Sequence, residues 1–123
     1  MAMVRTFRDL IAWQKGMELA KVVYTATQKM PESERFGLTN QIRRAVVSIA
    51  SNIAEGHARQ SRADYLKFLR IARGSLAELM TQIELALSLR MLPPNIALRA
   101  MLEEEDRILQ GLIRSLERKS KQV

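Results

Sequence analysis

The sequence contains no cysteine, one histidine, five glycines and three prolines among 123 residues, and aromatic residues make up only 5%. Without cysteine the chain has no disulfide, no thiol nucleophile and no thiolate metal site, which fits a cytoplasmic protein. Because glycine and proline are scarce, we expect long helices joined by short connections. No apolar run reaches the ~20 residues of a membrane span, and the N-terminus lacks a signal peptide's apolar core.

The shortage of histidine also argues against an enzyme. A zinc or di-iron site in a helical bundle needs several convergent histidine or carboxylate ligands, such as paired Glu-x-x-His motifs, and the chain has no such motif. The lone His57 is expected in an exposed loop, a nucleophilic triad lacks its partners, and no glycine-rich phosphate loop is present. We therefore expect no catalytic residue, no metal and no cofactor.

Basic residues outnumber acidic ones. Twenty Lys and Arg against thirteen Asp and Glu give a formal net charge of +7. Such a balance favours association with polyanions, chiefly nucleic acid, although it carries no information on sequence specificity.

Helical periodicity predicts four helices, at about residues 8–29, 36–56, 62–91 and 96–117, in a single domain spanning residues 1–123. Two residue pairs, Thr6 with Asp9 and Ser61 with Asp64, have the spacing of capping boxes, and Gly56 suits the end of a helix. Gly74, in the middle of the third helix, predicts a tight helix crossing. Short connections favour an all-α, antiparallel, up-down-up-down four-helix bundle.

The most unusual stretch is QIRRAVVSIASNIAEG, residues 41–56. Its helical wheel carries a core face, a face of small residues and a polar seam between them, which indicates a helix enclosed by neighbours on most sides. This stretch resembles the four-helix-bundle proteins encoded by intervening sequences of bacterial 23S rRNA genes. Further matches are Leu10–Lys15, Tyr24, Gly37, Leu38, Tyr65, Phe68, Leu69, Ile71–Ser75, Glu78 and Leu79.

The resemblance covers about residues 7–116, nearly the whole chain. It implies a small helical bundle that assembles into a ring-shaped pentamer. The family's biochemical activity is poorly defined, so the resemblance implies a fold more firmly than a function. Its genomic setting within rRNA genes makes RNA the natural partner to consider.

A polar seam runs along one edge of the second helix. It consists of Gln41, Ser48, Asn52 and Glu55, and Glu78 on the third helix is placed to extend it. One interpretation is a buried hydrogen-bond ladder that fixes helix register or joins subunits, because buried polar groups must be paired. The other is a ligand-binding pocket or nucleotide contact. The structural interpretation is favoured.

A row of basic residues predicts a phosphate-binding face on the third helix. Arg62, Arg70 and Arg73 fall within roughly 80° of the helical wheel, Lys67 lies nearby, and Arg59 extends the row. The alternative is a solvated face that aids solubility. Tyr65 and Phe68 fall on the core side, so base stacking is not indicated.

The first helix has an apolar arc roughly 200° wide, broader than one core requires. Its stripe of Leu10, Trp13, Met17, Ala20 and Tyr24 predicts Trp13 as a core anchor. On the second helix, the small-residue side of Val47, Ala50 and Ala54 predicts an oligomer interface.

Glu105 interrupts the leucine seam of the fourth helix. If it is buried it needs a partner, for which Arg43 or Arg44 is a candidate; alternatively it lies at an exposed helix edge.

Two classes of function stay open. The first is a non-enzymatic, homo-oligomeric module that binds RNA or DNA through a basic surface. The second is a scaffold or adaptor for an acidic protein partner. Salt-dependent binding to nucleic acid would separate them.

Overall fold

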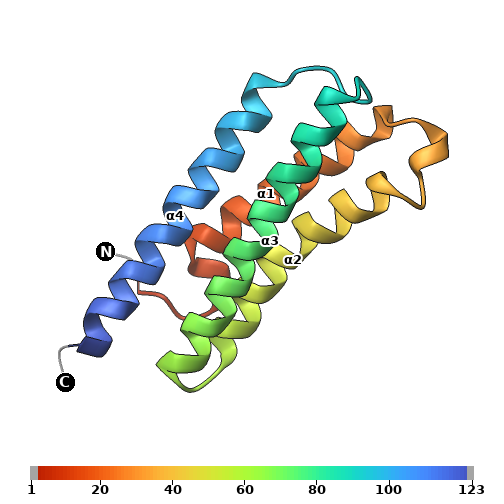
Figure 1. Ribbon diagram of the computed structural model, residues 1–123. Coiled ribbons are helices and arrows are strands. Elements are labelled where there is room, and N and C mark those ends of the chain that lie inside the picture. Colours follow the sequence, from red (N-terminus) through yellow and green to blue (C-terminus); the bar gives the residue numbers. More distant parts are fainter. Residues whose placement is uncertain (1–2, 122–123) are drawn as a thin grey trace.

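The computed structural model describes residues 3–121, and its long elements are four α-helices (Figure 1). They are α1 (Ile11–Ala26), α2 (Leu38–Ala58), α3 (Arg62–Ser88) and α4 (Ile96–Lys121), with short 3-10 turns at Phe7–Asp9, Thr27–Lys29 and Glu32–Glu34. The predicted all-α four-helix fold is confirmed. Of the predicted domain 1–123, residues 1, 2, 122 and 123 lie outside the described residues.

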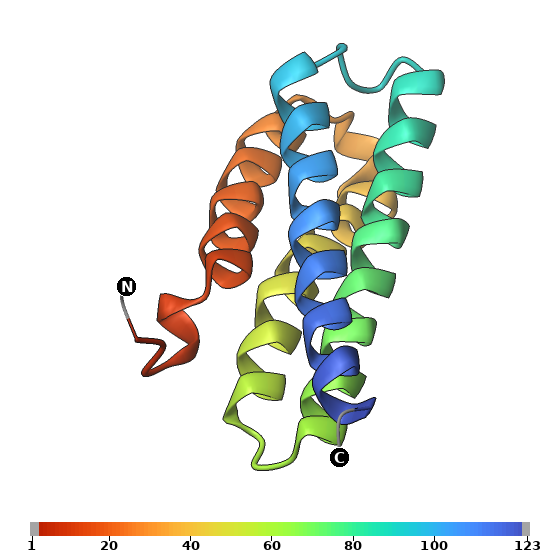
Figure 2. The ribbon, with the colours of Figure 1, turned by 90° about the vertical axis from the view of Figure 1, so that its left-hand side faces the viewer.

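Each helix runs antiparallel to the next. Gly16 of α1 lies against Ala50 of α2, whereas Tyr24, further along α1, meets Arg43, which is earlier in α2. Ion pairs between α3 and α4 show the same reversal, because the pair at Arg70 involves a later α4 residue than the pair at Arg73. Figure 2 shows α4 in front, with α1 and α3 on either side of it.

The core is almost entirely aliphatic. Its largest fully buried apolar side chains are Leu19, Val23, Ile42, Val46, Ile49, Ile53, Leu69, Leu76, Leu79 and Leu109. On α1, α2 and α3 they recur at intervals of three, four or seven residues, which places them on one face of each helix. Among the described residues, no helix combines the length and apolarity that crossing a membrane requires.

The first helix begins later than predicted. Thr6 and Asp9 do form the predicted capping box, but it closes only the 3-10 turn Phe7–Asp9. Leu10 then adopts an extended conformation, and α1 starts at Ile11. The capping signal therefore located the turn correctly, whereas periodicity alone did not reveal the break at Leu10.

The buried face of α1 also differs from the expectation. The buried positions are Ala12, Gly16, Leu19 and Val23. Trp13 is only half-buried and packs edge-to-face on Phe7, with the ring centroids 5.2 Å apart. Trp13 is therefore not the central core anchor, because its stripe lies at the rim of the core.

Glycines at two helix positions were interpreted wrongly. Gly56 does not end α2; it lies inside the last turns, where an added Cβ would be 2.7 Å from the Cβ of Phe68. Gly74 makes no tight crossing, since an added Cβ there would meet no atom within 4 Å. The close approach of α2 and α3 therefore lies at their shared corner.

The third helix ends at Ser88, before the predicted limit at residue 91. Arg90 takes a left-handed conformation with φ of 59°, and the Met91 amide donates to the carbonyl of Ala86 at 2.8 Å. Together with the bond from the Arg90 amide to the Leu87 carbonyl at 3.0 Å, this forms a Schellman-type cap, in which glycine usually occupies the position that Arg90 takes here. At the other end of the chain, α4 continues beyond residue 117 to Lys121.

Candidate nucleic-acid interface

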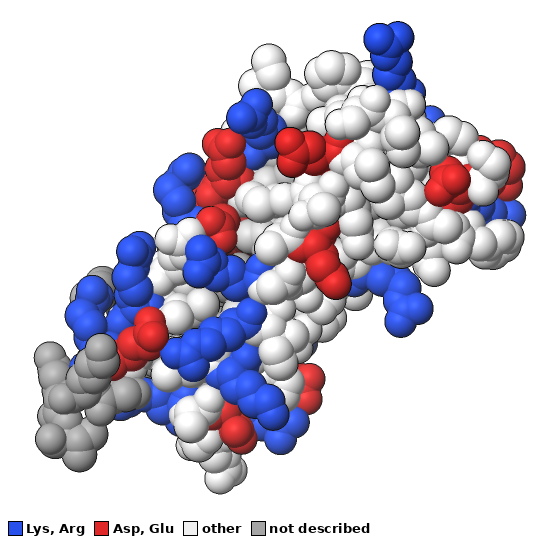
Figure 3. Space-filling model, in the orientation of Figure 1, with Lys and Arg blue, Asp and Glu red and all other residues white. Residues whose placement is uncertain are grey.

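Basic side chains gather over the N-terminal half of α3 and the C-terminal half of α4 (Figure 3). All five residues predicted for this surface, Arg59, Arg62, Lys67, Arg70 and Arg73, are exposed. The capping side chain of Ser61, which accepts a hydrogen bond from the Asp64 amide at 3.0 Å, fixes where the basic row begins.

Two arginines of the row are held by acidic residues of α4. Arg70 Nη2 lies 3.1 Å from Glu117 Oε2, and Arg73 Nε lies 3.1 Å from Asp106 Oδ1. These pairs link α3 to α4 at the surface and neutralise part of the charge. Arg70 and Arg73 are thus structural as well as basic, which sequence periodicity could not show.

The fourth helix contributes basic residues that the sequence analysis missed. Arg107 and Arg114 are exposed and lie within about 60° of Gln110 on the helical wheel. Gln110 donates to Asp106 at 2.6 Å, and Asp106 pairs with Arg73 of α3, so Arg107 and Arg114 flank the edge of α4 that meets α3. The seven-residue spacing of Arg107 and Arg114, two helical turns, was the available signal.

We call the surface formed by Arg62, Lys67, Arg70, Arg73, Arg107 and Arg114 the α3–α4 basic face. Its six cations face two acids, Asp106 and Glu117. Arg62, Arg107 and Arg114 have no ion pair within the described part of the chain. Arg59 lies at the α2–α3 corner instead, paired with Glu55 at 2.9 Å and stacked over the Phe68 ring.

The polar seam is built around Ser48. Its hydroxyl lies 2.8 Å from the hydroxyl of Ser75 on α3, and Asn52 Nδ2 donates to Ser48 Oγ at 2.8 Å. Asn52 also donates to the Ser48 carbonyl. The seam therefore joins α2 to α3 inside one chain.

The other seam residues do not take part in this network. Gln41 and Glu78 are exposed, and Glu55 is occupied by Arg59 at the surface. Ser75, which the sequence analysis left out, supplies the contact from α3 instead.

The outer surface between α1 and α2 carries exposed apolar side chains. Met17 is 38% exposed, Tyr24 42% and Val47 45%, while Ala54 is half-buried. Ala50 was predicted to belong to this surface, but it is only 4% exposed because it packs beneath Gly16 of α1. Ala50 therefore belongs to the monomer core.

Arg43 closes one end of this outer α1–α2 surface. Its guanidinium lies over the Tyr24 ring at 4.7 Å, and its Nε donates to Thr27 Oγ1 at 2.9 Å. The sequence analysis had suggested Arg43 as a partner for Glu105. These contacts hold Arg43 elsewhere, so it does not reach Glu105.

Glu105 is fully buried, so the exposed alternative is wrong. Neither carboxyl oxygen has a hydrogen-bond partner among the described residues, and neither Arg43 nor Arg44 pairs with it. Burial raises its pKa to about 8, with the nearby Glu104 adding to the rise and Lys15 opposing it. The side chain is therefore protonated at neutral pH.

His57 was expected in an exposed loop but lies in the last turn of α2. Its ring is half-buried and meets the Tyr65 ring edge-on at 5.6 Å. Across residues 3–121, no group of three or more His, Cys, Asp or Glu side chains is placed to hold a metal ion.

Comparison with known proteins identifies the family of this chain. The family model described as 23S rRNA-intervening sequence protein matches residues 8–113. The chain belongs to this family. No curated protein matches it.

A solved structure has the same fold. It is a protein of unknown function from the S23 ribosomal protein family of Bacteroides thetaiotaomicron, 25% identical, with a TM-score of 0.74. The match covers 85% of this chain and 96% of that one.

Proposed function

We propose that this protein is a non-catalytic, homo-oligomeric module that binds RNA through the α3–α4 basic face. The observation that carries the proposal is the convergence of six exposed cations from two helices on one surface with only two acids between them. Phosphate groups are the natural ligands of such a surface, because binding releases the counterions condensed on nucleic acid.

The chemistry of the face favours backbone contacts over base recognition. Its residues are arginine and lysine, while the nearby Phe68 is half-buried under Arg59. Without exposed aromatic rings the face has no platform for base stacking. We therefore expect affinity for RNA with little dependence on its sequence.

Assembly would multiply this charge. A ring, a pentamer by the family resemblance, repeats the face once per subunit and so strengthens the attraction of a polyanion. The exposed apolar surface between α1 and α2 supports the existence of an interface, since a contact there would cover Met17, Tyr24 and Val47.

A filter-binding assay with a structured RNA across a salt series tests the proposal. The informative variant changes Arg62, Arg107 and Arg114 to Gln, because these residues make no ion pair and their loss leaves the α3–α4 bridges intact. The slope of log affinity against log salt should fall by roughly 2 to 3, given about 0.7 to 0.9 per phosphate contact.

The matched control changes Arg5, Arg44 and Arg90 to Gln, which removes the same charge from other surfaces. It should retain most of the affinity and slope. An equal loss in both variants would reduce the effect to net charge, and absence of binding at low salt would refute RNA binding altogether.

A further inference from the structure

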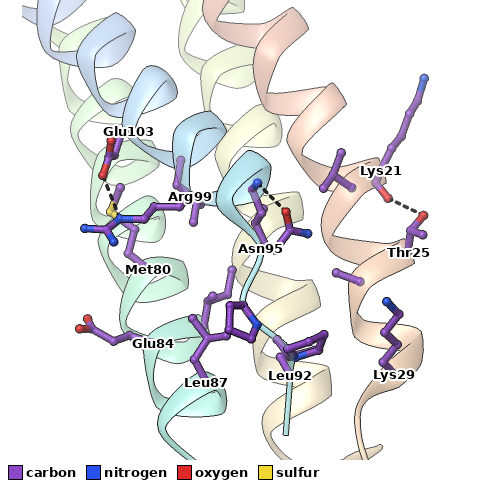
Figure 4. Close-up of a pocket in the computed structure, with 17 residues that line it drawn as sticks. Lys21, Thr25, Lys29, Met80, Glu84, Leu87, Leu92, Asn95, Arg99 and Glu103 are labelled. Atoms are coloured by element: carbon purple, nitrogen blue, oxygen red, sulfur yellow. Dashed lines mark hydrogen bonds and ion pairs between the residues drawn. The ribbon is translucent and has the colours of Figure 1, made fainter. Parts of the chain in front are cut away.

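A cleft of about 680 Å³ opens at the end of the bundle where α4 begins (Figure 4). It lies between the C-terminal halves of α1 and α3 and the start of α4. Its buried apolar lining includes Ile83, Leu92, Leu98 and Leu102. A concave, mainly apolar site of this volume with a few polar groups at its rim is typical of ligand or peptide binding.

Apolar side chains are also exposed at this end of the molecule, which Figure 3 shows as mostly uncharged. Leu87 lines the cleft and is 36% exposed, and Leu89 just beyond α3 is 54% exposed. Ile96 and Phe36 are largely exposed at the same end. Such a concentration of exposed apolar area around a cleft marks an interaction site.

One wall of the cleft carries two lysines, Lys21 of α1 and Lys29 of the 3-10 turn that follows it. Neither has an acidic partner in the described part of the chain, and Thr25 between them is occupied by its bond to the Lys21 carbonyl. Lys29 follows Lys21 by eight residues and lies beyond the end of α1, so the two lysines belong to different turns of the chain. Two separate cations on one edge of the cleft are complementary to two carboxylates along one edge of a partner helix.

The opposite wall carries charge of the other sign. Figure 4 shows Glu84 and Glu103 on the side of the cleft away from Lys21 and Lys29. Glu103 is paired with Arg99 at 3.3 Å, whereas Glu84 has no cationic partner among the described residues. An anionic membrane surface would be repelled by Glu84 and Glu103. The rim instead favours an occupant that carries acidic groups only on the edge facing the two lysines.

We propose that this cleft docks an amphipathic α-helix of a partner protein, with its apolar stripe in the cleft and its acidic edge against Lys21 and Lys29. The mode is the insertion of a helix into an apolar groove, in which apolar anchors supply affinity and rim charges set orientation. The cleft and the α3–α4 basic face share no residue, so the proposal is independent of RNA binding.

Fluorescence anisotropy of a labelled 18-residue helical peptide tests the charge pattern. The peptide carries leucines at i, i+3, i+4 and i+7 and two glutamates eight residues apart on one edge; a twin peptide has lysines in their place. The double variant Lys21→Glu/Lys29→Glu should bind the glutamate peptide about tenfold more weakly and the lysine peptide more tightly than the unmodified protein does. The double variant Arg5→Glu/Arg44→Glu is the charge control and should change neither affinity, because both residues are exposed outside the cleft and outside the α3–α4 basic face.

A second pair of variants tests the apolar contact. Leu87→Ser should weaken binding, whereas Leu89→Ser, which removes an even more exposed leucine outside the cleft, should not. No binding of the glutamate peptide to the unmodified protein would overturn the proposal, as would equal effects of Leu87→Ser and Leu89→Ser. Displacement of the peptide by oleate with the same dependence on both lysines would assign the cleft to a small carboxylate and also overturn it.

Discussion

Gly16 of α1 faces the Glu105 carboxyl of α4 so closely that a Cβ at residue 16 would lie 2.9 Å from Glu105 Oε2. The same Cβ would be 3.4 Å from the Cβ of Ala50 on α2. Glycine therefore makes room for a buried acid where three helices meet. Because the carboxyl has no hydrogen-bond partner among residues 3–121, its burial is unfavourable even though the packing around it is tight.

Replacing Gly16 with alanine should destabilise the protein by about 1 kcal/mol, because moving the buried Glu105 carboxyl costs more than the ~1 kcal/mol that alanine gains over glycine inside a helix. The cost should be smaller when Glu105 is also alanine, since the carboxyl no longer occupies the space. Urea unfolding of the two single variants and the double variant measures this coupling. Strictly additive effects would show that Glu105 does not constrain residue 16.

Glu105 should make stability depend on pH. Its pKa is about 8 in the folded state, against 4.5 for an ordinary glutamate. Between these values the folded chain keeps a proton that the unfolded chain releases, so the free energy of unfolding falls as pH rises, by up to about 1.4 kcal/mol per unit. The contribution is fully present below the unfolded pKa and is lost as pH approaches about 8.

Glu105→Gln removes this titration while keeping nearly the same shape. The variant and the unmodified protein should therefore differ little near about pH 5, and the variant should become more stable by ~3 kcal/mol toward pH 8. Other titrating groups are common to both proteins and cancel in the difference. Parallel pH profiles for the two proteins would mean that Glu105 is ionised or solvated in the folded state.

Two glycine-to-alanine changes should have opposite signs. Gly74→Ala should stabilise the protein by about 0.5 to 1 kcal/mol, because residue 74 is exposed in mid-helix and the new Cβ meets nothing. Gly56→Ala should destabilise it, because the new Cβ would lie only 2.7 Å from Phe68 Cβ. The cost of relieving this clash exceeds the stability that alanine gains over glycine in a helix. Thermal unfolding of the two variants under one condition decides the signs, and stabilisation by both would contradict the close packing at the α2–α3 corner.

These glycines show what sequence reasoning could and could not reach. The number of helices follows from local periodicity, and the caps at Thr6 and Ser61 follow from residue spacing, so the bundle was predictable. Which glycine meets another helix depends on the crossing geometry, which the wheel of a single helix does not contain. The same limit applies to Ala50, since a small residue suits an oligomer interface and a tight internal crossing equally well.

The basic face was predictable in part for the same reason. The α3 arginines lie on one side of the helical wheel and were therefore identified. Their neighbours Arg107 and Arg114 belong to α4, and tertiary packing alone decides which side of α4 lies next to α3. Ion pairs such as Arg73 with Asp106 join residues 33 apart in sequence, so no local pattern announces them. Acidic side chains are almost never fully buried without a partner, so the sequence offered no reason to expect the unpaired burial of Glu105, and only the structure shows it.

The last prediction concerns assembly through the outer α1–α2 surface. Met17, Tyr24 and Val47 remain exposed in the single chain, and a homo-oligomer would bury them. Val47→Glu should place a charge in that contact and shift the protein toward monomer while leaving the fold intact, because residue 47 is already 45% exposed. Ala50→Glu is unsuitable for this purpose, since a charge at that buried position would unfold the monomer.

Analytical ultracentrifugation at micromolar concentration measures the outcome, with circular dichroism to show that each variant stays helical. Ile71→Glu is the matched control, because Ile71 is a similarly exposed aliphatic residue, 42%, on α3. We expect an oligomer for the unmodified protein and for Ile71→Glu, and dissociation for Val47→Glu alone. A monomeric unmodified protein would rule out the ring and the multivalent RNA binding that depends on it, whereas equal dissociation of both variants would place the interface elsewhere.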